Sequence, residues 1–263
     1  MHIIVCMKQV PDHEGTRENY EIDHDLKRVE PRGIPPVISL FDENALEAAL
    51  RIKDAKEDVK ITILSIGKRI SDAVMLRVLA AGADELVKIE DENFASEKLD
   101  SLSTSRIIAE AIKRIGDYDL ILVGRQASDW NNGYMGIGLG GILNIPCVTF
   151  AQNVDIQSEF LIVNRVLENG YEMIRSELPA VVVVSNELGE LRYPPMKERR
   201  KAKNKPIHSW SGKDIPLKEP IGNKLESKRL YYPELKTTEC TYIEEETPMQ
   251  AGIHMARILF KDR

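Results

Sequence analysis

The residues best suited to chemistry occupy positions 124–136, with the sequence Gly-Arg-Gln-Ala-Ser-Asp-Trp-Asn-Asn-Gly-Tyr-Met-Gly. They follow an apolar run at 120–123, which is typical of a buried strand. The side chains of Asp129, Asn131 and Asn132 can hydrogen-bond hydroxyl or amide groups. A loop of small residues that enters a helix can also offer backbone N–H groups to a phosphate. The pattern favours nucleotide binding, but it matches neither G-x-G-x-x-G nor a Walker loop, so a glycine-rich turn with close helix packing remains an alternative.

Two further strand ends are expected beside this loop, at residues 5–8 and 65–67. In an open parallel sheet, ligands bind beyond the carboxyl ends of the strands. Lys8 there would either neutralise a phosphate or be an ordinary surface lysine. We interpret Cys6 as a small core residue rather than a nucleophile, because no histidine lies near it in the sequence.

The histidines and cysteines show no metal-ligand spacing and no Cys-x-x-Cys pair, so we expect neither a metal site nor a disulfide scaffold. They are His2, His13, His24, His208 and His254, with Cys6, Cys147 and Cys240. No Ser-His-Asp arrangement can be argued from spacing, and we expect no catalytic acid or base. Three widely separated cysteines fit a reduced, cytoplasmic compartment.

The composition restricts the class of protein. The 263 residues carry 36 Lys+Arg against 42 Asp+Glu, and the net charge of −6 argues against a chain-wide nucleic-acid surface. The apolar run at 180–184 is far shorter than the roughly 20 residues that span a bilayer, so we expect no membrane insertion. The N-terminus lacks a basic region before its apolar stretch and is interpreted as a strand rather than a secretory signal. The length suits one large domain or two small ones.

The elements that must position the loop alternate in type. Short apolar runs at 2–10, 59–66, 86–89 and 120–123 predict strands. Helices are predicted between them, the first capped by Asp42, the second from Ser71 to Gly82, and the third ending at Gly116. This order predicts an α/β fold with a parallel sheet covered on both faces.

After the fourth strand the pattern changes. Strands are expected at 148–150 and 180–184, with a small antiparallel excursion between them. Residues 11–36 are predicted to form a loop of mixed charge. We divide the chain into an α/β nucleotide-binding domain at 1–190, a basic segment at 191–205 and an extended arm at 206–263, with a short terminal helix at 251–260. An arm of that length generally needs a partner to lie on.

Several motifs, in this order along the chain, resemble the β subunit of the electron-transfer flavoprotein family. They are Lys-Gln-Val-Pro-Asp at 8–12, Asp-Glu-Asn-Ala-Leu-Glu-Ala-Ala-Leu at 42–50, Gly-Arg-Gln-Ala-Ser-Asp at 124–129, Leu-Pro-Ala-Val-Val-Val-Val at 178–184, Glu-Leu-Arg-Tyr-Pro at 190–194 and Lys-Ala-Lys at 201–203. No single one is specific, but together they are.

The resemblance implies a three-layer α/β/α fold of the adenine-nucleotide-hydrolase-like kind. It also implies a heterodimer with a larger α subunit, onto which the C-terminal arm crosses. The β subunit would hold AMP in ordinary members, or a second FAD that accepts hydride from NADH in electron-bifurcating members. The implied nucleotide contacts are Cys6, Ser39, Phe41, Asp42, Ile66, Arg125, Gln126, Ala127, Ser128, Asp129, Asn131, Asn132, Gly133, Tyr134 and Gly136.

The stretch Asp-Ser-Leu-Ser-Thr-Ser at 100–105 decides between the two kinds. It is similar to the Asp-x-x-x-Thr-Ser stretch that bifurcating β subunits place near their second flavin, so Asp100 and Thr104 join the expected cofactor contacts. The alternative is that Ser103 or Thr104 simply caps a helix. Trp130 and Tyr134 would line the pocket or partly fill it.

Residues 194–201, Pro-Pro-Met-Lys-Glu-Arg-Arg-Lys, look like the family's recognition loop for partner dehydrogenases. The implied docking residues are Tyr193, Pro195, Met196, Lys197 and Lys201. Met196 falls where the family carries an apolar anchor, and the basic residues would steer an acidic partner. The alternative is an exposed basic loop without a partner.

The favoured interpretation is an electron-transfer flavoprotein β subunit that moves electrons between NADH or a flavin dehydrogenase and a partner oxidoreductase. It would hold FAD for bifurcation, and its partner would be an acyl-CoA dehydrogenase or a quinone-linked flavoprotein. One alternative is a non-bifurcating β subunit with structural AMP. The other is a stand-alone adenine-nucleotide-binding regulator.

Overall fold

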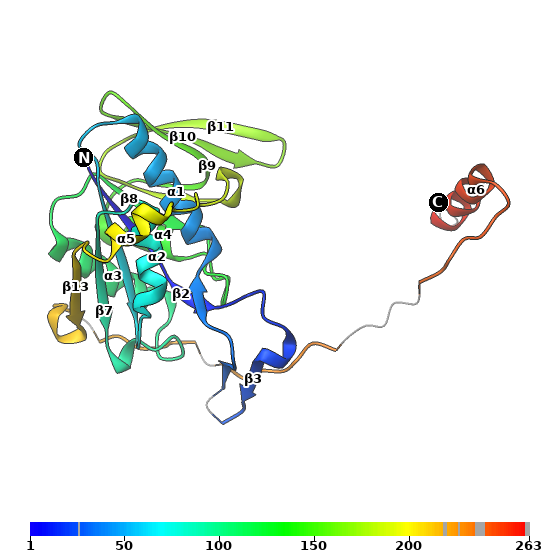
Figure 1. The fold of residues 1–263 in the computed structure, drawn as a ribbon, viewed down its shortest axis with the longest axis horizontal. Helices are drawn as coiled ribbons and strands as arrows, with labels where there is room; N and C mark the ends of the chain where they lie inside the picture. Colours follow the sequence, from blue (N-terminus) through cyan, green and yellow to red (C-terminus); the bar gives the residue numbers. More distant parts are fainter. Residues whose placement is uncertain (26, 218–219, 226, 235–239, 261–263) are drawn as a thin grey trace. The chain divides into compact units, whose positions relative to one another are not determined.

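The computed structural model describes residues 1–25, 27–217, 220–225, 227–234 and 240–260 (Figure 1). Contacts between residues divide the chain into two units, Met1–Arg229 and Leu230–Arg263. The first unit contains the main sheet and its covering helices, and the described residues of the second contain one helix.

In the described residues, the strands are β1 (His2–Cys6), β2 (Gln9–Pro11), β3 (Tyr20–Asp23), β4 (Arg28–Pro31), β5 (Pro36–Ile38), β6 (Lys60–Gly67), β7 (Glu85–Glu90), β8 (Leu120–Gly124), β9 (Cys147–Gln157), β10 (Phe160–Leu167), β11 (Gly170–Glu177), β12 (Ala180–Val184) and β13 (Ile207–Ser211). The helices are α1 (Leu40–Ala55), α2 (Asp72–Ala81), α3 (Ser101–Ile115), α4 (Met135–Leu143), α5 (Met196–Ala202) and α6 (Pro248–Leu259), with 3-10 turns η1 (Arg17–Asn19), η2 (Glu92–Phe94), η3 (Asn186–Leu188) and η4 (Gly212–Asp214).

The main sheet has the strand order β11-β10-β9-β12-β8-β1-β6-β7-β13. The strands from β9 to β13 in this order pair in parallel, whereas β9, β10 and β11 form an antiparallel meander. The chain runs from β1 to β6 and β7 on one side, then returns to β8 on the other side of β1. The topological switch point, where α/β sheets bind ligands, therefore lies between β1 and β8.

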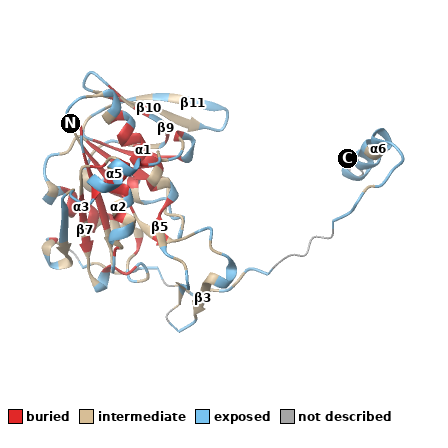
Figure 2. Ribbon diagram, viewed as in Figure 1, coloured by how far each residue is buried: buried red, intermediate tan, exposed pale blue. Residues whose placement is uncertain are grey.

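Alternating side chains divide the sheet into two faces. In β8, Leu120 and Leu122 belong to the core beneath α1 and α2, while Ile121 and Val123 belong to the core beneath α3 and α4. Figure 2 shows the central strands buried between these layers. The expected three-layer α/β/α fold is confirmed, and the reason is the two-residue period of a strand with apolar side chains on both faces.

Glycines allow α4 to approach the sheet closely. A Cβ at Gly136 would overlap the side chain of Val183 and lie 2.8 Å from Val123 Cγ2, and a Cβ at Gly140 would lie 2.8 Å from Cys147 Cβ. By contrast, a Cβ at Gly141 would meet nothing within 4 Å. The sequence analysis gave close helix packing as an alternative role for these glycines, and Gly136 and Gly140 do have that role.

Three expectations about local structure are wrong. Helix α1 begins at Leu40 with Ser39 as its N-cap, so Asp42 lies in the first turn instead of capping it. The recognition loop expected at 194–201 is largely helical, because residues 196–202 form α5, with Pro195 as its N-cap. Residues 11–36, expected to be a loop, contain η1 and the β3–β4 hairpin. The sequence pattern did not reveal that these two short strands pair.

The C-terminal segment from residue 206 does not leave the first unit at once. Its strand β13 extends the sheet in parallel with β7, with Trp210 opposite Ile89. The guanidinium of Arg114 lies 4.7 Å from the centroid of the Trp210 ring. The parts of the predicted arm at 218–219, 226, 235–239 and 261–263 lie outside the described residues.

The second unit contains α6, which confirms the predicted terminal helix. Thr247 accepts a hydrogen bond from the Gln250 backbone, and Pro248 occupies the first turn. Met249, Leu259 and the following Phe260 are exposed. In the described parts of the chain, no helix combines the length and apolar character needed to cross a bilayer.

We predict different effects of Gly136→Ala and Gly141→Ala on the free energy of unfolding. Gly136→Ala should lower it by about 1–3 kcal/mol because the added methyl group overpacks the contact with β12. Gly141→Ala, in the same helix, should leave it unchanged or raise it by up to about 1 kcal/mol, since alanine favours helix. Urea unfolding curves measure both, and equal effects would contradict the packing role of Gly136.

Candidate functional site

Ser39 joins the start of α1 to the loop that follows β8. Its side chain is fully buried, and its Oγ accepts a hydrogen bond from the Ser128 backbone N–H at 3.2 Å. The same hydroxyl lies 3.5 Å from the carbonyl oxygen of Gln126. The predicted contacts Ser39, Gln126 and Ser128 are thus brought together at the carboxyl end of β8, as parallel-sheet topology requires.

Asp42 lies in the same place because α1 packs directly on β8. A Cβ at Gly124 would overlap the Asp42 carboxylate and the Phe41 backbone, so only glycine fits there. Asp42 Oδ2 accepts the Lys8 backbone N–H at 2.7 Å, which ties α1 to the end of β1. Burial raises the pKa of Asp42 to about 7, although hydrogen bonds from the backbones of Lys8 and Gly124 oppose that shift.

An ion pair spans the two strand ends at the switch point. Lys8 Nζ lies 2.6 Å from Asp129 Oδ2, and the side chains are 34% and 16% exposed. Lys8 therefore faces the loop after β8, where it could meet a phosphate, and is not directed away from it. A phosphate at this edge would therefore meet a cation that already has a carboxylate partner.

The loop has a defined internal structure. Gln126 Nε2 donates to Asn131 Oδ1 at 3.0 Å, and the Asn131 backbone donates to the Ala127 carbonyl at 2.8 Å. Asn131 and Gly133 have φ angles of 53° and 63°, a region that Asn and Gly tolerate best. The exposed loop backbone thus turns back toward α4, and its shape depends on these residue types.

The loop also reaches α3. Asn132 Nδ2 donates to Ser101 Oγ at 3.2 Å, where α3 begins. Tyr134 is the N-cap of α4, and its ring lies against the position of Gly138. Trp130 and Tyr134 are 48% and 41% exposed. Ser101 is a contact that the sequence analysis missed, although it lies inside the quoted 100–105 stretch.

Asp100 is the N-cap of α3, and Thr104 lies in the first turn of that helix. Asp100 Oδ1 accepts the Ser103 backbone N–H at 2.7 Å, and the Thr104 hydroxyl donates to the Asp100 carbonyl at 2.8 Å. Residues 222 and 224 of the C-terminal segment bond to the second carboxylate oxygen of Asp100 and to the hydroxyl of Ser103. Asp100 Oδ2 accepts the Lys224 backbone N–H at 3.1 Å, and the Ser103 hydroxyl donates to the Gly222 carbonyl at 2.7 Å. A helix cap is therefore present, but Asp100 forms it, and the expectation that Ser103 or Thr104 is the cap is wrong.

The remaining predicted contacts differ in their surroundings. Cys6 is buried at the end of β1, and burial raises the pKa of its thiol far above the ordinary range, as expected of a core residue. Ile66 packs partly buried in the core beneath α3. Arg125 lies with its guanidinium 4.9 Å from the centroid of the Phe150 ring, facing the β9 side of the sheet. Gly136 serves helix packing, as described above.

Two buried hydroxyls test whether a polar ligand fits at this edge. Ser128 Oγ and Ser65 Oγ are shielded from solvent, and neither has a hydrogen-bond partner among the described residues. Ser128 lies in the loop and Ser65 near the carboxyl end of β6. Buried hydroxyls are normally satisfied, so a nucleotide bound at this edge fits the residues present. Among the described residues there is no group of three side chains suited to hold a metal ion.

The predicted docking residues project from the segment that contains α5. Tyr193 and Met196 are 77% and 66% exposed, and the guanidinium of Arg199 lies 4.5 Å from the Tyr193 ring centroid. Lys197 is exposed, and Lys201 pairs with Glu198 at 2.8 Å on the helix surface. The structure therefore presents an apolar side chain within a basic surface, well separated in sequence from the nucleotide loop.

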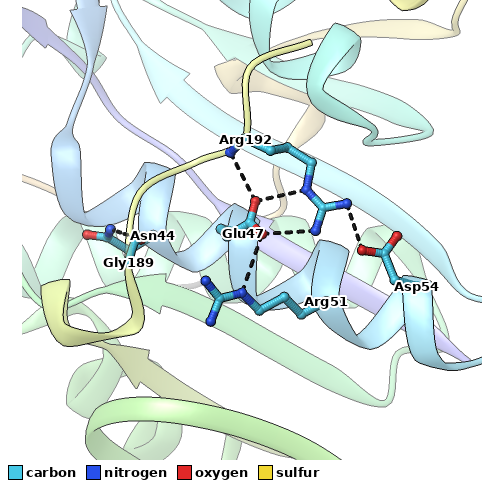
Figure 3. A network of polar contacts seen from close by, with 6 residues as sticks. All are labelled: Asn44, Glu47, Arg51, Asp54, Gly189 and Arg192. Carbon is cyan, nitrogen blue, oxygen red and sulfur yellow. Dashed lines mark hydrogen bonds and ion pairs between the residues drawn. The ribbon is translucent and has the colours of Figure 1, made fainter. Parts of the chain in front are cut away.

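Sequence reasoning missed a buried polar network on α1, which Figure 3 shows. Glu47 is 5% exposed and binds the side chain of Arg192 through both carboxylate oxygens, at 2.9 and 3.0 Å. The available signal was a single glutamate within the apolar stretch 45–50, because a buried charge generally requires a partner.

Comparisons with known proteins agree on one family. A model described as electron transfer flavoprotein domain matches residues 29–215. The chain is 35% identical over 217 residues to the caffeyl-CoA reductase-Etf complex subunit CarD of Acetobacterium woodii, covering 82% of this chain and 80% of CarD. It is 36% identical over 213 residues to the electron transfer flavoprotein subunit beta of Megasphaera elsdenii, covering 79% and 77%. Protein FixA of Azorhizobium caulinodans is 28% identical over 267 residues, covering 96% and 92%.

We predict that replacing Asp42 changes how stability depends on pH. Because its pKa is near 7 when folded and ordinarily 3.8, the folded state holds the proton more tightly. Its contribution to stability is complete below about pH 4 and is lost as the pH rises through 7, by at most roughly 4 kcal/mol. In nucleotide-free protein, the melting temperature of the wild type should therefore fall relative to Asp42→Asn over that range. Parallel pH profiles would contradict a buried, titrating Asp42.

Proposed function

The chain belongs to the electron transfer flavoprotein family, and on that premise we propose that it is the β subunit of a heterodimer that carries electrons from NADH or a flavin dehydrogenase to a partner oxidoreductase. Its relatives include electron transfer flavoprotein β subunits, and β subunits of this family pair with an α subunit. A stand-alone regulator is a weaker proposal, because similarity to β subunits spans most of this chain.

The observation that carries the proposal is the polar edge at the switch point between β1 and β8. There Ser39, Asp42 and Asp129 converge from α1 and the loop, and the Ser128 hydroxyl has no partner within the described residues. Ser39 and Ser128 would bind polar groups of a nucleotide, Lys8 would balance phosphate charge, and Asp129 would accept from a hydroxyl. A bound flavin would itself supply the redox chemistry, including acceptance of hydride from NADH.

FAD in this subunit, and with it electron bifurcation, is the favoured version. It rests on the similarity of residues 100–105 to the stretch that bifurcating members place near their second flavin. Thr104 and Ser101 lie at the beginning of α3, and Asn132 connects that position to the nucleotide loop. A flavin there would lie across both regions, bound by side chains from two parts of the chain.

One observation favours structural AMP instead. Asp100 and Ser103 already bond to the backbone of Lys224 and Gly222, so the C-terminal segment uses the groups that a flavin would otherwise meet. A smaller nucleotide confined to the loop after β8 leaves those bonds intact. In that case this subunit would hold AMP and contribute docking and support while the flavin lies in the α subunit.

Two surfaces support the proposed partners. Met196 within the basic surface of α5 suits docking to an acidic, pocketed partner, and the name of CarD links that relative to a caffeyl-CoA reductase. We therefore propose an acyl-CoA dehydrogenase, or a quinone-linked flavoprotein, as the partner. The exposed apolar residues of α6 suit contact with the α subunit, in keeping with the proposed arm at 206–263.

Nucleotide content tests the proposal. The chain would be co-expressed with the α subunit, and the nucleotides released by acid would be counted. Two FAD per heterodimer without AMP are expected, and NADH should then reduce flavin. One FAD with one AMP would support the structural-nucleotide version. Absence of any nucleotide beyond the FAD of the α subunit would refute the proposed site.

We predict that Asp129→Ala lowers the occupancy of the nucleotide in this subunit by about tenfold at limiting nucleotide, since loss of one charge-assisted hydrogen bond costs about 1.5 kcal/mol. The matched control is Asp72→Ala, because Asp72 likewise pairs with a lysine, Lys88 at 2.8 Å, but lies on α2. Equal retention of nucleotide by the two variants would remove Asp129 from the site.

We predict that Met196→Ala raises the KM for the partner dehydrogenase several-fold, because an exposed apolar anchor is lost, and leaves the cofactor content unchanged. Met173→Ala is the matched control, since Met173 is 69% exposed but lies on β11. Raising the salt concentration should slow transfer by screening the basic residues. Rates that are independent of salt, with an unchanged KM, would rule out docking through α5.

A further inference from the structure

The proposed docking helix α5 is short and mostly exposed. It has seven residues, and of these only Ala202 is buried. An isolated helix of this length is unstable in water, because nucleation costs more than one or two turns recover. Its orientation is therefore set by packing against α2, through Ala202 among others, and by contacts at its two ends.

The entrance to α5 is held by the carboxylate of Glu47. Both of its oxygens accept hydrogen bonds from the Arg192 side chain, and Oε2 also accepts the Arg192 backbone N–H at 3.1 Å (Figure 3). The other terminal nitrogen of Arg192 lies 2.7 Å from Asp54 Oδ2, about two turns further along α1 than Glu47. Arg192 immediately precedes Tyr193, so this contact fixes the backbone where the docking residues begin.

A second contact on α1 supports the same segment. Asn44 Nδ2 donates to the carbonyl oxygen of Gly189 at 2.6 Å, as Figure 3 also shows. Gly189 has a φ of 109°, a conformation that other residues rarely adopt. One face of α1, with Asn44 and Glu47 three residues apart, therefore binds residues 189–192 by both backbone and side chain.

The exit from α5 is held by Lys205. Its Nζ donates to the carbonyl oxygens of Leu79 and Ala83, at 2.9 and 2.6 Å, at the carboxyl end of α2. A cation at this end also interacts favourably with the helix dipole. Burial lowers the pKa of Lys205, in keeping with an enclosed ammonium group. The next residue, Pro206, accepts the Leu86 backbone N–H and leads into β13.

Burial separates these contacts from the ion pairs on the surface of α5. Glu47 is 5% exposed, so without Arg192 its poorly hydrated carboxylate would keep only the longer contact of 3.4 Å with Arg51 Nε among the described residues. The pair between Lys201 and Glu198 is exposed on both sides, and such pairs contribute little. The ends of α5 thus have one strongly preferred arrangement, while its outer side chains remain free to adapt.

We infer that Glu47 and Lys205 are positioning residues that hold the two ends of α5, so that the partner oxidoreductase meets a preorganised docking surface. The inference rests on the proposed docking function of α5. A preorganised surface loses less conformational entropy on association. Loosening either end should therefore weaken docking without altering the nucleotide site or the transfer step itself.

The test compares Glu47→Gln and Lys205→Met with Glu43→Gln in the cofactor-loaded heterodimer. Glu43 is the matched control because it is also a glutamate of α1, but it pairs with Arg77 at 3.6 Å instead of residues 189–192. Electron transfer to an acyl-CoA dehydrogenase would be measured against dehydrogenase concentration. Both test variants should raise the KM about threefold to tenfold with kcat unchanged, whereas Glu43→Gln should not. Reduction of a small dye, which needs no docking, should be equal in all.

Two further measurements guard against general loss of structure. Hydrogen exchange at 193–202 should be faster in Glu47→Gln than in Glu43→Gln, with equal exchange in the central strands. Arg192→Lys keeps the charge but not the two-pronged contact, and should give an intermediate KM. If the KM of Glu47→Gln equals that of the control while Met196→Ala raises it, the positioning role is overturned and docking stands. If Met196→Ala also has no effect, both ideas fail.

Discussion

Helix α1 meets the sheet at Gly124 without room for a side chain, and the positions of both functional regions depend on that contact. Its first turn brings Ser39 and Asp42 to the ends of β8 and β1. Its next turns carry Asn44 and Glu47, which hold residues 189–192. A rigid helix thus connects a nucleotide edge to a docking segment, and a shift of α1 would displace both.

Charge is used differently in the two regions. At the nucleotide edge, Asp42 is buried and accepts hydrogen bonds from backbone N–H groups, whereas Lys8 and Asp129 form a pair open enough for a ligand to compete with it. At the docking segment, Glu47 is buried and paired, while the lysines of α5 face solvent. Buried pairs give fixed geometry and exposed charges give attraction at a distance, so one surface can be both positioned and electrostatically active.

The C-terminal segment takes part in the fold before it leaves the first unit. It adds β13 to the sheet, and Gly222 and Lys224 then bond to Ser103 and Asp100 at the start of α3. The identity of the nucleotide and the path of this segment are therefore connected. A ligand that reaches α3 must share its polar groups with the segment or displace it, whereas one confined to the loop need not.

Local patterns in the sequence were sufficient for the α/β/α fold, since alternating apolar strands and helices up to residue 124 leave few other arrangements. The same patterns located the loop after β8, and motif order indicated the family. Residue periodicity did not predict α5 or the capping of α1 by Ser39, because such short-range choices depend on what packs nearby. Tertiary structure alone decided that Glu47 meets Arg192 and that Asp100 meets Lys224. Their separations of 145 and 124 residues exceed any local pattern, and only the folded sheet brings them within hydrogen-bonding distance.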